Sequence, residues 1–124
     1  TVNASYKVLG TTTTANLFRV TSPTNNRLLY AGTKTRKFAA LASLSAVYSG
    51  NSSSFINFSF YIAKNGVILP ESKQSTLLIN NSNPVSLSIS CNVILAPNDY
   101  VEVYVVNSTD ATNVIVQTLN LSIN

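Results

Sequence analysis

Histidine, methionine and tryptophan are absent from this chain of 124 residues, and only four residues are acidic. Without histidine, the chain lacks the base of a Ser-His-Asp triad and the most frequent metal ligand in proteins. Asp99 and Glu102 are close in sequence, but their spacing beside a predicted strand directs the two side chains to opposite sides. They therefore do not form the facing carboxylate pair of a glycosidase. We expect a protein that is not an enzyme and that binds no cofactor and no metal ion.

Cysteine and long apolar runs are also scarce. The single cysteine, Cys91, excludes an internal disulfide. It occupies the buried register of an alternating segment, where a free thiol behaves as a small hydrophobic side chain. No apolar run approaches the roughly 20 residues of a membrane-spanning helix, and no signal peptide is recognisable. Because the chain begins at Thr1 without a methionine, we expect a C-terminal piece of a longer protein.

The net charge of +4 arises more from scarce acids than from abundant bases. Lys34, Arg36 and Lys37 form the only basic cluster in the sequence. No aromatic residues are interleaved with this cluster, as they are in many nucleic-acid-binding surfaces. A solvated loop with basic ends is therefore favoured over a nucleic-acid interface.

The clearest pattern runs from residue 85 to residue 123. Residues 85–95 alternate between apolar side chains and Ser or Asn, which is typical of a strand with one buried face. Residues 96–99 contain Pro, Asn and Asp and predict a turn. In residues 100–106 the valines share one face, whereas Tyr100, Glu102 and Tyr104 share the other. Residues 114–123 alternate again and predict a final strand.

The preceding residues also predict strands rather than helices, because Ser, Thr and Asn are abundant and Gly and Pro mark turns. Asn65-Gly66 between apolar segments is the strongest short hairpin signal in the chain. We expect loops at residues 32–37, 49–54 and 107–113. The expected strands are residues 6–8, 17–20, 27–30, 38–48, 55–63, 67–69 and 75–79. Together with the last three strands, this gives about eight to ten strands. Such a number of short strands predicts an all-β sandwich or barrel. We expect it to form a single domain over residues 1–124. Residues 1–16 are either a linker or an edge strand.

Two segments carry a family resemblance. Residues 85–95, followed by the run from Pro97 to Val105, a polar loop and a terminal strand, resemble the end of the tumour-necrosis-factor/complement-globular-head superfamily. Residues 58–66, which end in Lys-Asn-Gly, are similar to a hairpin found in phage and large-DNA-virus versions of that domain. The resemblance covers roughly residues 38–124. It departs at Asn98, where the pattern prefers glycine, but Asn also tolerates positive φ.

The resemblance implies a ten-stranded jelly-roll β-sandwich that assembles as a homotrimer, often on a fibrous stalk. In that family the trimer forms largely from the outer faces of strands near the C-terminus. Tyr100 and Tyr104 are therefore the candidate trimer interface, because they face away from the core valines and Tyr is enriched at interfaces. The alternative is that both are ordinary half-exposed tyrosines of a sheet.

By the same resemblance, the function is expected to be host attachment by the head, or knob, of a viral spike or fibre on the virion surface. Three copies of a weak site would bind a host-cell receptor, either protein or glycan, with avidity. An upstream stalk would join the head to other virion proteins. Nucleic acid and membrane insertion are not expected. The candidate receptor-contact residues lie in three predicted loops and are Lys34, Arg36, Lys37, Asn51, Ser53, Asn107 and Asp110.

Two alternatives remain open. The first is a purely structural module that decorates a virion or trimerises a stalk. The second is a carbohydrate-binding β-sandwich, which needs aromatic side chains exposed on a loop or in a groove. Most aromatic residues of this chain lie in strand registers.

Overall fold

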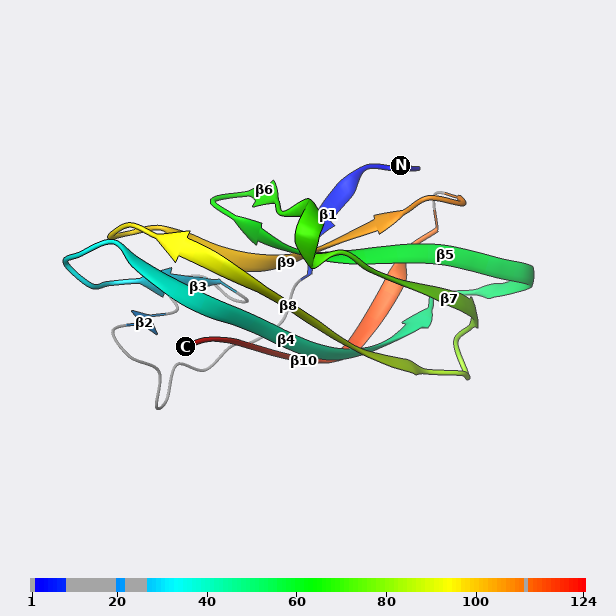
Figure 1. Ribbon diagram of the computed structural model, residues 1–124. Coiled ribbons are helices and arrows are strands. Elements are labelled where there is room, and N and C mark those ends of the chain that lie inside the picture. Colours follow the sequence, from blue (N-terminus) through cyan, green and yellow to red (C-terminus); the bar gives the residue numbers. More distant parts are fainter. Residues whose placement is uncertain (1, 9–19, 22–26, 111) are drawn as a thin grey trace.

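The computed structural model describes residues 2–8, 20–21, 27–110 and 112–124 as two antiparallel sheets packed face to face (Figure 1). The large sheet has the order β2-β3-β9-β5-β6, with β1 paired to β9 and β7 paired to β5. The small sheet has the order β10-β4-β8. The strands of the large sheet are β1 (Ser5–Lys7), β2 (Val20–Thr21), β3 (Leu28–Tyr30), β5 (Asn51–Lys64), β6 (Val67–Ile68), β7 (Gln74–Asn80) and β9 (Tyr100–Asn107). Those of the small sheet are β4 (Arg36–Tyr48), β8 (Val85–Leu95) and β10 (Val114–Ile123).

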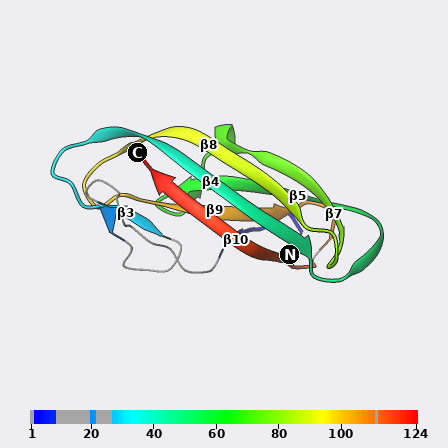
Figure 2. The same cartoon turned by 90° about the horizontal axis from the view of Figure 1, so that it is seen from below.

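The chain passes repeatedly from one sheet to the other. It crosses between β3 and β4, between β4 and β5, between β7 and β8, between β8 and β9, and between β9 and β10. Figure 2, turned by 90°, shows β4, β8 and β10 side by side across the strands of the large sheet. This arrangement is a jelly-roll-like all-β sandwich with ten strands among the described residues, as the sequence predicts.

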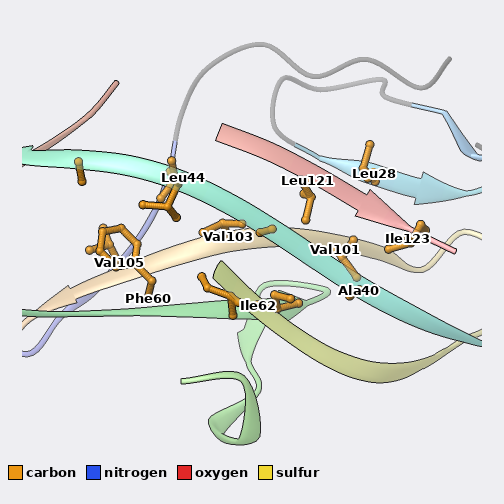
Figure 3. Packing of buried hydrophobic residues seen from close by; sticks show 14 of the residues in the cluster. Leu28, Ala40, Leu44, Phe60, Ile62, Val101, Val103, Val105, Leu121 and Ile123 are labelled. Atoms are coloured by element: carbon orange, nitrogen blue, oxygen red, sulfur yellow. The ribbon is translucent and has the colours of Figure 1, made fainter. Parts of the chain in front are cut away.

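Alternation along the strands places one apolar face of each sheet in the core. Phe60 and Ile62 of β5 and Val101 and Val103 of β9 are completely buried, and they face Ala40, Leu44, Leu121 and Ile123 of the small sheet (Figure 3). Burying each of the larger side chains stabilises the fold by about 1.5–3 kcal/mol. The core side of β4 also carries small side chains, because Ala40, Ala42 and Ala46 are all buried.

Two turns have the backbone geometry that their residues predict. Asn65 and Gly66 between β5 and β6 have φ angles of 51° and 82°, so both lie in the left-handed region that a two-residue hairpin requires. Asn98, between β8 and β9, has a φ of 73°. Asn can therefore occupy the position where the family pattern prefers glycine, as expected.

The predicted loop at residues 49–54 is wrong. Only Ser49 and Gly50 form the turn, and β5 already begins at Asn51, which pairs with Asn80 of β7. The register shifts between Asn51 and Ile56. The serine run therefore lies in an irregular part of β5, between two positions that pair with β7.

Other boundaries differ by a few residues. The predicted loop at residues 32–37 ends earlier, because Arg36 and Lys37 pair with Leu95 and Ile94 at the start of β4. Within residues 1–16, β1 forms the expected edge strand at Ser5–Lys7. Of the predicted strand at residues 17–20, only Val20 belongs to the described residues, where it begins β2.

Candidate functional site

The outer face of the large sheet carries a group of tyrosines. Tyr61 of β5 lies directly opposite Tyr104 of β9, and Tyr100 lies on the same face of β9. All three side chains are half-buried, whereas Val101 and Val103 are fully buried on the opposite face. We call Tyr61, Tyr100 and Tyr104 the tyrosine face. The predicted outward direction of Tyr100 and Tyr104 is confirmed.

Glu102 lies between Tyr100 and Tyr104 on this face, yet its side chain is only 1% exposed. Its Oε2 atom is 2.7 Å from Nζ of Lys7 and 3.0 Å from Nε of Arg27. A buried carboxylate is tolerated only when it is paired and hydrogen-bonded, and here two cations meet at one oxygen. The cluster joins β1 and the residue before β3 to the central strand β9.

Tyr100 and Tyr104 both interact with this charge cluster. The guanidinium of Arg27 lies 3.8 Å from the ring centroid of Tyr100, which is a cation–π arrangement. Burial and the neighbouring Glu102 carboxylate raise the pKa of Tyr104 above its usual value. The phenol of Tyr104 is therefore protonated at neutral pH and lies beside a charge cluster whose Glu102 carboxylate is paired with Lys7 and Arg27.

The loop between β3 and β4, residues 31–35, is built around Tyr30. This side chain is fully buried, packs edge-on against Phe38 at 4.9 Å between centroids, and donates a hydrogen bond of 2.7 Å to the carbonyl oxygen of Lys34. The Tyr30 ring also occupies the space that a Cβ on Gly32 would need. Only glycine therefore fits at position 32 beside the Tyr30 ring.

The predicted contact residues lie at two opposite ends of the sandwich. Lys34, Arg36 and Lys37 are exposed near the β3–β4 loop, and Asn51 and Ser53 are exposed in β5 at the other end. The structure therefore does not bring the predicted receptor-contact residues together on one surface.

Asn107 and Asp110 serve the structure of the β9–β10 loop. Asn107 is only 8% exposed, and its Oδ1 accepts hydrogen bonds from the backbone N–H groups of Thr109 and Asp110. Its Nδ2 donates to Oδ1 of Asp110 at 2.7 Å and to the carbonyl of Thr112 at 2.8 Å. The hydroxyl of Tyr48 donates to Oδ2 of Asp110 at 3.0 Å. The polar groups of Asn107 are thus used within the loop rather than offered to a partner.

A cleft of about 310 Å³ opens between the two sheets beside β1 and β10. Its lining is mixed, and Tyr6, which is 51% exposed, belongs to it. The other lining residues are the apolar Val8, Phe58, Val105, Val114 and Val116 and the polar Lys7, Asn107, Thr112 and Asn113. Sequence reasoning did not predict this cleft, because its walls come from strands of different sheets whose separation no local pattern encodes.

Other chemistry is limited in the described part of the chain. No group of three or more His, Cys, Asp or Glu side chains within it could hold a metal ion. Cys91 is a free thiol that packs partly against the core, in the register that its sequence predicts. Burial and the Glu71 carboxylate raise the pKa of this thiol. Within the same residues, no helix is long and apolar enough to cross a membrane.

Comparisons with known proteins give no family. No protein-family model and no curated protein matches the sequence. Among solved structures, the chain is similar to Xyl-CBM35 in complex with a glucuronic acid-containing disaccharide, at 12% identity and a TM-score of 0.37. That alignment covers 98% of this chain and 88% of the other. A likeness at this level carries no information on function.

Proposed function

We propose that this chain is a non-enzymatic head domain that assembles as a homotrimer through the tyrosine face and attaches to a host cell from the surface of a virion. The sequence resemblance to viral head domains supplies the viral setting. The single structural observation that supports self-association is the cluster of Tyr61, Tyr100 and Tyr104 on an outward face.

The chemistry of this face suits an interface between copies of the chain. Tyr and Arg are enriched in interfaces, because each combines a broad apolar body with a polar tip. Arg27 is stacked on Tyr100, and its charge is compensated by Glu102. A second copy could therefore cover the rings without burying an unpaired charge, which would cost several kcal/mol.

The proposal that the chain binds rather than catalyses is supported by the contacts that three of its acidic side chains make. Glu102 is paired with Lys7 and Arg27, and Asp99 lies 3.6 Å from Lys64. Asp110 accepts hydrogen bonds from Tyr48 and Asn107. These three carboxylates hold the fold together, and none is placed to act as a general acid or base beside another.

Light scattering on this chain tests the proposal. We expect a mass of about three times the 13.3 kDa of the chain, persisting on dilution to the micromolar range. Tyr104→Lys is expected to shift the mass towards the monomer while far-UV circular dichroism stays unchanged. Phe55→Lys is the matched control, because Phe55 is an exposed aromatic residue, 58% accessible, outside the tyrosine face. A wild-type monomer at all concentrations would refute the trimer, and a folded, trimeric Tyr104→Lys variant would refute this face as the interface.

A carbohydrate-binding module is the second candidate, supported by the interlayer cleft. Tyr6, which is 51% exposed, lines this cleft together with Thr112 and Asn113. An aromatic face beside hydrogen-bonding groups suits the apolar and hydroxylated sides of a sugar ring. NMR titration with a panel of neutral monosaccharides tests this candidate. Shifts confined to the cleft and lost in Tyr6→Ser would favour it, and no shift at millimolar sugar would exclude it.

A further inference from the structure

We infer that the attachment surface is the end of the sandwich that carries Lys34, Arg36, Lys37 and Lys64, and that its partner is an acidic polysaccharide bearing sulfate or carboxylate groups. This inference rests on the proposed attachment function and names the class of receptor. We call these four residues the basic end.

Three connections meet at the basic end. The backbone N–H of Tyr30 donates to the carbonyl of Asp99, and the N–H of Asn98 donates to the carbonyl of Tyr30. These bonds join the β3–β4 loop to the β8–β9 turn, and Asn65 joins the β5–β6 turn to the same place through Asp99. In Figure 1 the cyan β3–β4 loop and the turn that follows β8 lie together on the left. Cations far apart in sequence are thereby gathered on one end of the molecule.

The two ends of the sandwich differ in charge. The basic end carries four cations and one acid among the described residues, and that acid, Asp99, lies 3.6 Å from Lys64. At the opposite end, the connections at residues 49–50, 81–84 and 108–113 contain no Lys or Arg, and their one acid is Asp110. One-sided charge of this kind steers an anionic partner towards the basic end.

Three of the four cations of the basic end, Lys34, Arg36 and Lys37, are exposed, whereas Lys64 is partly buried. The side chains of Lys34 and Lys37 are exposed, and neither forms an ion pair with a described residue. Arg36 is also exposed. Binding a polyanion would therefore break no ion pair of Lys34 or Lys37.

The loop that presents Lys34 is preorganised. The Tyr30 hydroxyl holds the Lys34 carbonyl, and the Tyr30 ring leaves no room for a side chain at Gly32. A loop that is already ordered loses little conformational entropy on binding, so weak charge contacts are sufficient for measurable affinity.

The pattern favours a polysaccharide over a single-stranded nucleic acid. Nucleic-acid surfaces of that type combine cations with aromatic rings on which bases stack. At the basic end, Tyr30 and Phe38 are buried, and Tyr100 is half-buried and covered by Arg27. Exposed cations without a stacking ring suit a flexible chain of sulfate or carboxylate groups, to which they bind by charge alone.

Heparin affinity chromatography of the whole chain tests the inference. We expect binding that weakens with salt, and elution of Lys34→Gln/Lys37→Gln at lower salt, with affinity reduced roughly tenfold. Lys73→Gln is the matched control, because Lys73 is an exposed cation outside the basic end, and it should elute close to the wild type. Equal losses in the control and the double variant would overturn the assignment to this end.

Two further arms separate the alternatives. Neutral dextran should not displace the chain from heparin. Duplex DNA, at a phosphate concentration equal to the sulfate concentration of soluble heparin, should displace it less well than soluble heparin does. Stronger binding to DNA than to heparin would overturn the polysaccharide assignment. Gly32→Ala keeps every charge but displaces Tyr30, so it should weaken heparin binding if preorganisation matters. A monomer that binds heparin through Lys34 and Lys37 would refute only the trimer, whereas a trimer that does not bind heparin would refute only this inference.

Discussion

Nδ2 of Asn65 donates a hydrogen bond of 2.9 Å to Oδ1 of Asp99, and this bond joins the β5–β6 turn to the β8–β9 turn. Oδ1 of Asn65 accepts the backbone N–H of Tyr100 at 3.0 Å, so both ends of the amide are used. The other oxygen of Asp99 accepts the N–H of Ala96 at 2.9 Å. Two turns with positive φ therefore stabilise each other through one amide and one carboxylate.

Replacing Asp99 should change how stability depends on pH. Hydrogen bonds from Asn65 and from the N–H of Ala96 hold the pKa of Asp99 below its usual value of about 3.9. A lowered pKa in the folded state stabilises the protein fully above the unfolded pKa, and this contribution is lost as the pH falls through the folded value. Asp99→Asn should therefore melt below the wild type at pH 7, and the difference between the two melting temperatures should be smaller at pH 2. Calorimetric melting curves at both pH values check this, and a gap independent of pH would contradict it.

Removing the carboxylate of Glu102 should strongly destabilise the folded protein. Because Glu102 is buried and meets Lys7 and Arg27, Glu102→Ala leaves two partly buried cations without their partner. We expect the free energy of unfolding to fall by about 3 kcal/mol, the lower part of the range for a broken buried pair, since both cations can still reach water. Urea unfolding monitored by circular dichroism measures this change.

The matched control for Glu102 is Glu71→Ala. Glu71 is exposed in the short 3-10 helix at Pro70–Ser72, so its loss should change stability by no more than about 0.5 kcal/mol. Similar losses for the two variants would show that the contacts of Glu102 with Lys7 and Arg27 do not stabilise the fold.

The β9–β10 loop should depend on Asn107. Its side chain makes hydrogen bonds to Thr109, Asp110 and Thr112, and each contributes about 1 kcal/mol net. Asn107→Ala should reduce stability by about 2–3 kcal/mol and should speed amide hydrogen exchange at Thr109 and Asp110. The control is Asn113→Ala, because Asn113 is exposed and its side chain makes none of these bonds. Unchanged exchange at Thr109 in Asn107→Ala would argue against the assigned role of Asn107.

The strands were predictable from the sequence because period-2 alternation reports directly on burial. Ile89, Val93 and Leu95 in β8 and Val101 and Val103 in β9 are all buried, in the register that the alternation assigns. The segment Asn51 to Ser54 was mispredicted as a loop because Asn and Ser favour loops, and Ser also occurs on exposed strand faces. Whether this segment belongs to a strand depends on its position beside β7, and no local sequence pattern reports that position.

Much of the candidate site depends on contacts between distant segments. The outward direction of Tyr100 and Tyr104 follows from alternation within one strand and was predicted. The charge cluster at Glu102 was not, because Lys7 and Arg27 reach Glu102 only after β1 and β3 both pair with β9. The roles of Asn107 and Asp110 were likewise missed, since a buried asparagine that organises a loop has the same sequence signature as an exposed one.

The reactivity of Cys91 provides a last prediction, which links the small sheet to Glu71. Burial, followed by the nearby Glu71 carboxylate, raises the pKa of the Cys91 thiol above its usual value. Less thiolate is then present at pH 8, so alkylation by iodoacetamide should be slower than for a free cysteine. Glu71→Gln removes the neighbouring negative charge and should speed the reaction. Mass spectrometry of the alkylated fraction against time measures both rates. Glu102→Gln, which removes a carboxylate on the other sheet, should not change the Cys91 rate as long as the variant is folded. If Glu71→Gln and the wild type reacted at the same rate, burial alone would account for the raised pKa.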